Sequence, residues 1–324
     1  MKLASTLFAL SAIILVGAIY FTDANLRASA RENAQRDLSA RAKNLADAID
    51  RNLQTRLIQT LTFAALPSLR GFAASDETGR ASRTAIAQNE LQAFVAADPN
   101  LRAAFILDAA GSVVLATDET MRASFAERLF FRAAMSGQLF ASAPAKDFGE
   151  VSQYYSAPLI DNAGNVAGVL VLRVAVQEFW NGIGKNEMVV DENGILIADG
   201  SDKPQTFFAL APIAGETYNQ LIAERRYGAE QGALRFSNRA ALASFSKVDS
   251  AGEFVFSDAN TPITFGAARK LQTNLWRVVI LQTEELLNAP ARAALFEAMK
   301  FGTLTFLAGV AFMIAFHRWR AEKN

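Results

Sequence analysis

The residues of this 324-residue chain that could do chemistry are few in kind. The sequence has no cysteine and a single histidine, His317, near its C-terminal end. A disulfide framework, a thiolate metal site and a cysteine nucleophile are therefore excluded. A lone histidine at that position cannot easily serve a Ser-His-Asp triad or a multi-histidine metal site in the body of the protein. Carboxylate chemistry, carboxylate-bound metals and binding without chemistry remain.

The carboxylates form no catalytic pattern. Glu127, Asp147 and Glu150 fall near the first predicted sheet, but their spacing does not pair them as general acid and base. Asp161 and Asp191 fall in predicted hairpin turns, where aspartate is favoured for its local bonds to the backbone. The sequence also lacks the phosphate-loop, dinucleotide, zinc-protease and serine-hydrolase motifs. We predict that the protein is not an enzyme and uses no metal or cofactor.

Arg173 is the strongest anomaly in the sequence. It lies in the apolar stretch 169–176, where strand alternation places it on the same face as Val169. A guanidinium there needs a counter-charge, because an unpaired charge in a desolvated site is costly. The arginine either reaches water at the strand end, meets an internal carboxylate such as Glu127 or Asp147, or binds an anion.

A second basic group begins a helix predicted at residues 125–136. Arg128 is followed by two phenylalanines, and Arg132, one turn later, is expected to be exposed. Two arginines that converge on one pocket repel each other unless an anion lies between them. An anionic ligand would resolve that conflict.

Two apolar segments near the chain ends predict a membrane protein. Residues 3–21 carry no charge, and a helix of that length spans roughly 28 Å, close to the hydrocarbon thickness. A cleaved signal peptide is the alternative for this segment. Residues 301–316 form a second uncharged stretch, followed by a basic and aromatic collar at 317–320. The positive-inside rule then puts both termini in the cytoplasm and the residues between the two segments on the far side of the membrane.

The charge balance gives no reason to expect a nucleic acid as a partner, since the sequence has 32 basic and 32 acidic residues and a net charge of zero.

The exported part begins with a long helix. In residues 23–66 apolar residues recur every three or four positions and draw one stripe along a helix. The stripe either packs on the domain alone or also supports a homodimer. Pro67 and Gly71 are expected to end this helix, before a polar linker at 75–82 and a short helix at 84–97.

An internal repeat predicts the rest of the fold. Residues 105–116 and 188–198 both read as a strand, an Asp-x-x-Gly turn and a strand. The fold class is therefore α+β, with two related antiparallel sheets and the helices on one side of the sheet. The predicted segments are a membrane helix at 1–21, a long exported helix at 22–70, a membrane-distal sheet domain at 71–180, a membrane-proximal sheet domain at 181–290, a helix leading into a second membrane helix at 291–316, and a cytoplasmic tail at 317–324.

Several blocks resemble a double Cache domain, the extracytoplasmic tandem PAS-like sensor module of bacterial receptors. They are the two hairpins of the repeat, residues 124–134, and the hairpin at 153–160 that leads into 168–174. Within that superfamily the sequence is most similar to the input domains of C4-dicarboxylate sensor histidine kinases of the DctB type. Phe130 and Leu129 stand where that family usually has tyrosine and proline.

The resemblance implies a cup for a small carboxylate ligand in the membrane-distal sheet domain. Arg128 and Arg173 would reach the ligand's carboxylates, and aromatic and hydroxyl side chains would line the cup. Amino-acid-binding relatives generally carry an acidic residue near position 173, so Arg173 argues against an amino acid. The implied ligand-binding residues are Arg128, Phe130, Phe131, Tyr154, Tyr155, Ser156 and Arg173.

The kinases of that family continue past the second membrane helix into dimerisation and ATP-binding domains, whereas eight residues follow it here. We therefore expect a homodimeric receptor subunit that signals to a separate cytoplasmic or membrane protein, such as a histidine kinase. The alternative is a ligand-free structural or assembly subunit of a membrane complex. An apolar cup, or Arg173 paired internally with Glu127 or Asp147, would favour that alternative.

Overall fold

The computed structural model describes residues 2–202, 204–229, 234–237, 253–256 and 264–322. The chain divides into two compact units. Unit 1 comprises Met1–Ala40, Glu253–Ala267 and Leu281–Asn324, and unit 2 comprises Arg41–Gly252 and Ala268–Ile280.

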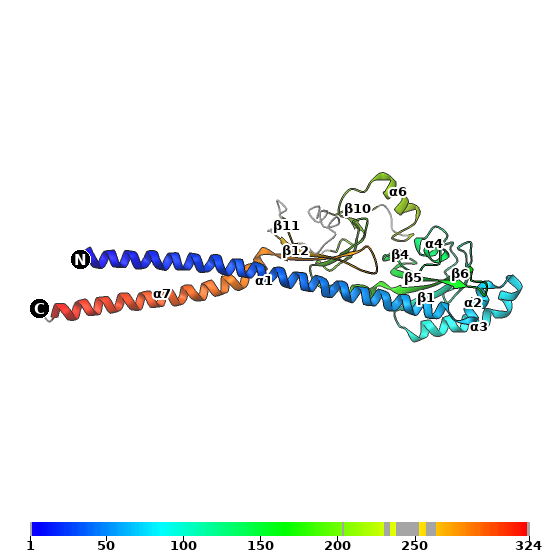
Figure 1. Ribbon diagram of the computed structural model, residues 1–324, viewed down its shortest axis with the longest axis horizontal. Helices are drawn as coiled ribbons and strands as arrows, with labels where there is room; N and C mark the ends of the chain where they lie inside the picture. Colours follow the sequence, from blue (N-terminus) through cyan, green and yellow to red (C-terminus); the bar gives the residue numbers. More distant parts are fainter. Residues whose placement is uncertain (1, 203, 230–233, 238–252, 257–263, 323–324) are drawn as a thin grey trace. The chain divides into compact units, whose positions relative to one another are not determined.

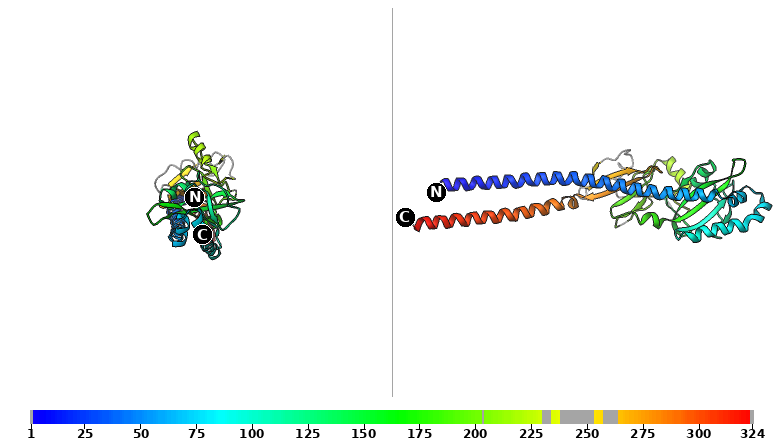
Figure 2. Two further views of the ribbon diagram at one scale, coloured as in Figure 1. Left: turned by 90° about the vertical axis from the view of Figure 1, so that its right-hand side faces the viewer. Right: turned by 60° about the horizontal axis from the view of Figure 1, so that its bottom comes forward.

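Unit 1 contains the two ends of the chain, which lie at the same end of this unit (Figure 2). They belong to the first part of α1 (Lys2–Ala64) and to α7 (Glu284–Glu322). Between them in this unit, β11 (Glu253–Phe256) pairs antiparallel with the start of β12 (Thr264–Lys270).

One helical stretch among the described residues is long and apolar enough to cross a membrane. It is Arg292–Ala311 in α7, with a mean hydropathy of 1.3 and no burial inside the protein. The first membrane segment, predicted at residues 1–21, has a helical backbone within α1, but most of its side chains lie outside the described part of the chain.

The long helix predicted from the apolar stripe is present, with different ends. Leu38, Ala42, Ile49 and Leu53 are buried along one side of α1, as their spacing predicts, whereas Leu61 is exposed. Within unit 2, the buried carboxylate of Asp50 on the same helix accepts hydrogen bonds from the backbone of Gln272 and Thr273 at 2.9 and 2.8 Å.

The expected end of that helix and the linker after it were wrong. The helix ends at Ala64, and Pro67 opens a separate helix, α2 (Pro67–Ala74), which contains Gly71. Proline fits this first position because the missing N–H would have no helical partner there. Most of the predicted linker is helical too, because Asp76 caps α3 (Glu77–Ala97) by accepting a bond from Gly79 N at 2.8 Å.

The first sheet of unit 2 has the order β2-β1-β6-β5-β3, with β4 also paired to β5. All its pairings are antiparallel. Its strands are β1 (Leu101–Leu107), β2 (Val113–Ala116), β3 (Phe140–Ala141), β4 (Ala145–Asp147), β5 (Glu150–Ile160) and β6 (Val166–Ala175).

Helices cover both faces of this sheet, which corrects the expectation that they lie on one side (Figure 1). The short helix α4 (Leu129–Met135) packs Phe130, Phe131 and Ala134 on the face that presents Val169 and Val171. On the other face, Ala73 of α2 approaches Gly168. One apolar cluster therefore fills the space between α4 and this face of the sheet.

The second sheet domain repeats the hairpin of the first, as the internal repeat predicted. Phe125 N donates to Gly111 O at 2.8 Å, and at the equivalent turn Leu210 N donates to Gly194 O at 2.9 Å. Both hairpins also contain a bulge before the turn. The described elements of this domain are α5 (Val176–Trp180), β7 (Glu187–Val190), β8 (Leu196–Asp199), β9 (Phe208–Ala209), α6 (Gly215–Ala223), β10 (Arg235–Phe236) and β13 (Arg277–Thr283).

Candidate functional site

Two buried arginines meet at one end of the first sheet. Arg128 precedes the first turn of α4 and is 5% exposed, and Arg173 lies near the end of β6 and is 3% exposed. Tyr154 of β5 is the register partner of Arg173, so its side chain lies on the same face of the sheet. The end of β6 and the start of α4 thus bring two positive charges to one site.

Arg128 forms a bidentate ion pair with Asp147. Its Nη2 lies 2.8 Å from Oδ2, and its Nη1 lies 3.3 Å from Oδ1. Tyr154 donates its hydroxyl to Oδ2 at 3.0 Å, and Ala229 donates its backbone N–H to Oδ1 at 2.6 Å. Burial acts to raise the pKa of Asp147, but the hydrogen bond and charge of Arg128, with the other two donors, outweigh it and hold that pKa below its ordinary value. The carboxylate is therefore ionised at neutral pH.

Arg173 pairs with Glu150. Its Nη2 lies 2.8 Å from the Glu150 carboxylate and 3.2 Å from the carbonyl oxygen of Asp147, while its Nε donates to Ser152 Oγ at 3.1 Å. The ring of Phe148 lies 5.1 Å from the guanidinium carbon, within the range of a cation–π contact. The sequence left Glu127 and Asp147 as internal partners. Asp147 contributes only its carbonyl, and Glu127 is exposed.

Both counter-charges come from a single tight turn. Asp147 ends β4 and Glu150 begins β5, and the two are register partners across the two-residue loop. That loop is Phe148-Gly149, with φ values of 55° and 77°, the left-handed pair that two-residue hairpin turns require. The turn therefore presents two carboxylates side by side to two guanidinium groups.

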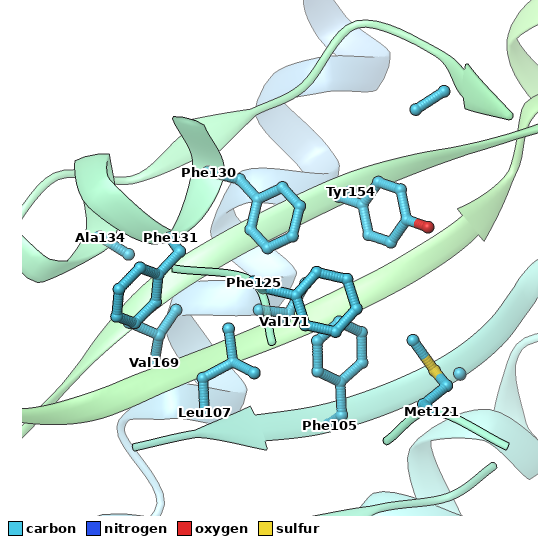
Figure 3. Packing of buried hydrophobic residues seen from close by; sticks show 12 residues of the cluster. Phe105, Leu107, Met121, Phe125, Phe130, Phe131, Ala134, Tyr154, Val169 and Val171 are labelled. Atoms are coloured by element: carbon cyan, nitrogen blue, oxygen red, sulfur yellow. The ribbon is translucent and has the colours of Figure 1, made fainter. Parts of the chain in front are cut away.

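Aromatic rings form the wall of the site next to Arg128. Phe130 stacks on Tyr154 with ring centres 5.0 Å apart and contacts Phe125 at 5.7 Å, as Figure 3 shows. The Arg128 guanidinium lies 5.5 Å from the Phe130 ring centre and 5.4 Å from that of Tyr154. Phe131 belongs to the adjoining apolar cluster and lies beside Val169 (Figure 3).

The remaining predicted site residues lie elsewhere. Tyr155 follows Tyr154 on β5 and therefore faces the other side of the sheet, where its hydroxyl donates to Gln153 Oε1 at 2.8 Å. Ser156 returns to the site's face, but its hydroxyl donates to the Phe130 carbonyl at 2.7 Å. The structure thus brings together Arg128, Phe130, Tyr154 and Arg173.

Sequence reasoning missed the turn that neutralises the arginines. Asp147 and Glu150 were named only as carboxylates near the sheet, with Asp147 as one possible partner of Arg173, whereas Phe148, Ser152 and Ala229 were not singled out. The sequence Asp147-Phe-Gly-Glu150 could have predicted this turn, since glycine favours the left-handed conformation of a tight turn and the two acids would then lie side by side. The part played by Ala229 had no signal, because it lies 82 residues from Asp147 in the chain. Among the described residues, no group of three or more histidine, aspartate or glutamate side chains could hold a metal ion.

Comparison with known families identifies the kind of domain in which these ion pairs lie. Residues 26–291 match the family model of the Cache domain. The chain belongs to the Cache domain family. This confirms the predicted resemblance, and with the helices and antiparallel sheets it confirms the α+β class. Cache domains are sensory ligand-binding domains, and no enzyme family is indicated.

Solved structures show the same fold at low sequence identity. The sensor domain of the Vibrio cholerae histidine kinase DctB is 14% identical, with a TM-score of 0.53 over 76% of this chain and 98% of that one. The isoleucine-bound sensory domain of the Campylobacter jejuni chemoreceptor Tlp3 is 13% identical, with a TM-score of 0.53 over 81% and 97%. The ligand-binding domain of Mlp24 with asparagine is 12% identical, with a TM-score of 0.55 over 82% and 99%. No curated protein matches the sequence.

Proposed function

We propose that this Cache domain is the sensor of a membrane receptor and binds a small organic anion between Arg128 and Arg173. The observation that carries the proposal is that a Cache domain holds two buried guanidinium groups at one end of its first sheet, both in contact with the same tight turn. An anion with two acidic groups can replace the carboxylates of Asp147 and Glu150 without leaving a buried charge unpaired.

The two ion pairs differ in how readily a ligand carboxylate can replace the internal one. Glu150 keeps 40% of its side chain exposed, so its carboxylate can turn into water when a ligand carboxylate takes its place at Arg173. Asp147 is 4% exposed, and leaving Arg128 without it would cost about 3–5 kcal/mol. A ligand therefore enters at Arg173, and complete exchange requires a second carboxylate that reaches Arg128.

This requirement supports a C4 dicarboxylate as the ligand class. Such a ligand replaces both internal carboxylates with its own. An amino acid brings one carboxylate, so one guanidinium would need to keep its internal partner. Its ammonium group would also meet Arg173, which repels it.

The membrane arrangement belongs to the same proposal. We infer a two-pass protein of the bacterial inner membrane, with both termini in the cytoplasm and the sheet domains outside. Support comes from the apolar stretch in α7 and from the sequence of residues 3–21. A homodimer formed along α1 and a separate signalling protein as the receiver of the signal complete the proposal.

The second candidate function is a ligand-free structural or assembly subunit of a membrane complex. The internal pairing of both arginines favours it, because a site that already satisfies its own charges needs no ligand. The two candidate functions predict different results when an internal carboxylate is removed: a receptor should then respond more strongly to an added dicarboxylate, and a ligand-free subunit should not respond.

Binding to the full chain in lipid nanodiscs tests the proposal, by calorimetry and thermal unfolding with succinate, malate, fumarate, acetate and amino acids. We expect the dicarboxylates to bind wild-type protein. Asp147→Asn leaves Arg128 without its counter-charge, so the unliganded protein should lose about 3 kcal/mol of stability. Added succinate should then raise its melting temperature more than it raises that of the wild type.

Arg132→Ala is the matched control for Arg128→Ala, since Arg132 lies one turn later and is half exposed. Arg128→Ala and Arg173→Ala should abolish binding, and Arg132→Ala should not. If no small carboxylate binds either the wild type or Asp147→Asn, the ligand-free role is the better account.

A further inference from the structure

We propose that unit 2 carries a second ligand site, a groove between its two sheet domains that binds a carboxylic acid with an apolar body. The groove has a volume of about 570 Å³, within the range of about 300–1,000 Å³ typical of small-molecule sites. Neither Arg128 nor Arg173 lines it. The site is therefore distinct from the one proposed above.

Both sheet domains contribute apolar walls to the groove. Leu129 and Phe140 come from the first domain, and Leu271, Leu275 and Trp276 come from the turn between β12 and β13. Leu275 is 58% exposed, which is unusual for a leucine beside a buried tryptophan. An apolar ligand body would remove this surface from water.

The polar lining favours a group that accepts hydrogen bonds. Arg226 and Asn274 both line the groove, and each has a buried side-chain nitrogen, Nε and Nδ2 respectively, without a hydrogen-bond partner in the described part of the chain. Buried donors are normally satisfied, so a ligand that draws these two side chains toward the groove would supply the acceptor that each nitrogen lacks.

The charge of the groove selects an anion. Arg226 pairs with Glu192, and Lys270 forms no ion pair within the described residues, so these three side chains leave one net positive charge. A carboxylate supplies both the acceptor oxygens and the complementary charge. Its apolar body distinguishes this ligand from the dicarboxylate proposed for the first site.

The wall of the groove is fixed before any ligand arrives. Asp50 on α1 accepts hydrogen bonds from the backbone N–H groups of Gln272 and Thr273, which holds the turn between β12 and β13 in place. A preformed site loses less conformational freedom on binding. The groove also lies next to the first site, since its lining residue Leu129 follows Arg128 in the chain.

Phenylacetate is the probe for this site, measured by calorimetry and tryptophan fluorescence on the full chain in nanodiscs. We expect saturable binding that succinate does not displace. Leu275→Glu places a negative charge on the exposed rim and should weaken binding about tenfold, whereas the uncharged Leu275→Gln should weaken it about threefold or less. Asn274→Ala should also weaken it, because a donor is lost.

Arg226→Gln should weaken phenylacetate binding, because a charged donor of the groove is lost. Arg225→Gln is its control, because Arg225 is the exposed neighbour in the chain. Phenylacetate should bind with unchanged affinity when succinate saturates the first site, which separates this site from the first. The proposal is overturned if phenylacetate does not bind wild-type protein. It is equally overturned if succinate displaces phenylacetate while Leu275→Glu leaves phenylacetate binding unchanged.

Discussion

At the scale of single residues, Asp147 explains what a ligand of the first site must offer. Its carboxylate receives the Arg128 guanidinium, the Tyr154 hydroxyl and the backbone N–H of Ala229. These donors are arranged around two oxygens in one plane, so a replacement must also be a planar, two-oxygen anion. The same donors lower the pKa of Asp147, and they would lower the pKa of a bound carboxylic acid in the same way.

Two adjacent tyrosines give a matched test of this arrangement. Tyr154→Phe removes one donor to the proposed anion site and should weaken succinate binding about tenfold to a hundredfold, the value of a hydrogen bond to a charged group. Tyr155→Phe removes a bond to Gln153 on the opposite face and should leave affinity unchanged, at a stability cost of about 1 kcal/mol. Calorimetry and chemical denaturation measure the two quantities.

Equal losses of affinity in the two variants would mean that the tyrosines act through the sheet as a whole. Such a result would contradict the assignment of the site to one face of β5.

At the scale of elements, a short segment joins the candidate site to the second sheet domain. Lys146 N of β4 donates to Tyr227 O at 2.7 Å, and Ala229 donates to the Asp147 carboxylate. Tyr227 donates its hydroxyl to the buried carboxylate of Asp191, in the turn between β7 and β8. Displacing Asp147 from Arg128 would therefore alter contacts that reach the second domain, and a ligand that favours one arrangement would shift the balance between the two.

Gly228 lies in this segment at a position that only glycine fits. Its φ is +104°, and a Cβ there would lie 2.2 Å from Lys146 O. Gly228→Ala should therefore force the segment away from β4. Gly137→Ala is the control, since its φ is +85° but nothing lies within 4 Å of the added Cβ. We expect a loss of about 1 kcal/mol for Gly137→Ala and a larger loss for Gly228→Ala.

Hydrogen exchange measures whether ligand binding at the first site affects the second sheet domain. In wild-type protein, succinate should change the exchange of residues 187–199, and Gly228→Ala should abolish that change while Gly137→Ala preserves it. A preserved response in Gly228→Ala would show that the segment does not carry the coupling.

The elements also show which parts of the fold could be predicted from the sequence. The Asp-x-x-Gly hairpins were predicted correctly because their signal is local: Asp108 and Asp191 each accept backbone bonds within four residues, and Gly111 and Gly194 supply a positive φ. The helix at 77–97 was predicted too short, because the polar residues before 84 suggested a linker and the capping role of Asp76 was overlooked.

The site was predictable only in part, for a physical reason. Strand alternation correctly placed Arg173 among apolar residues on one face, since that rule is also local. Its counter-charge depends on how a turn folds back across the sheet, and single-sequence spacing does not give that. Tyr155 was grouped with Tyr154 because of the family resemblance, although strand alternation alone puts the two on opposite faces.

At the scale of the whole molecule, the absence of cysteine allows a direct test of membrane topology. Single cysteines can be introduced at Ser82 in α3 and at Glu322 at the end of α7, both of which are exposed. If the chain crosses the membrane twice with both termini in the cytoplasm, a membrane-impermeant maleimide should label Ser82→Cys in intact bacterial cells. Glu322→Cys should react only after lysis, because the hydrocarbon core separates the two positions.

A third variant, with a cysteine inserted between Met1 and Lys2, distinguishes an anchor from a cleaved signal peptide because this position precedes the apolar segment. If residues 3–21 remain as a membrane helix, the full-length protein keeps this cysteine and the maleimide reaches it only after lysis. If the segment is a signal peptide, the mature protein carries no label at this position under any condition. Labelling of Glu322→Cys in intact cells would contradict the topology directly, because the basic collar at 317–320 would then lie outside the membrane, against the positive-inside rule.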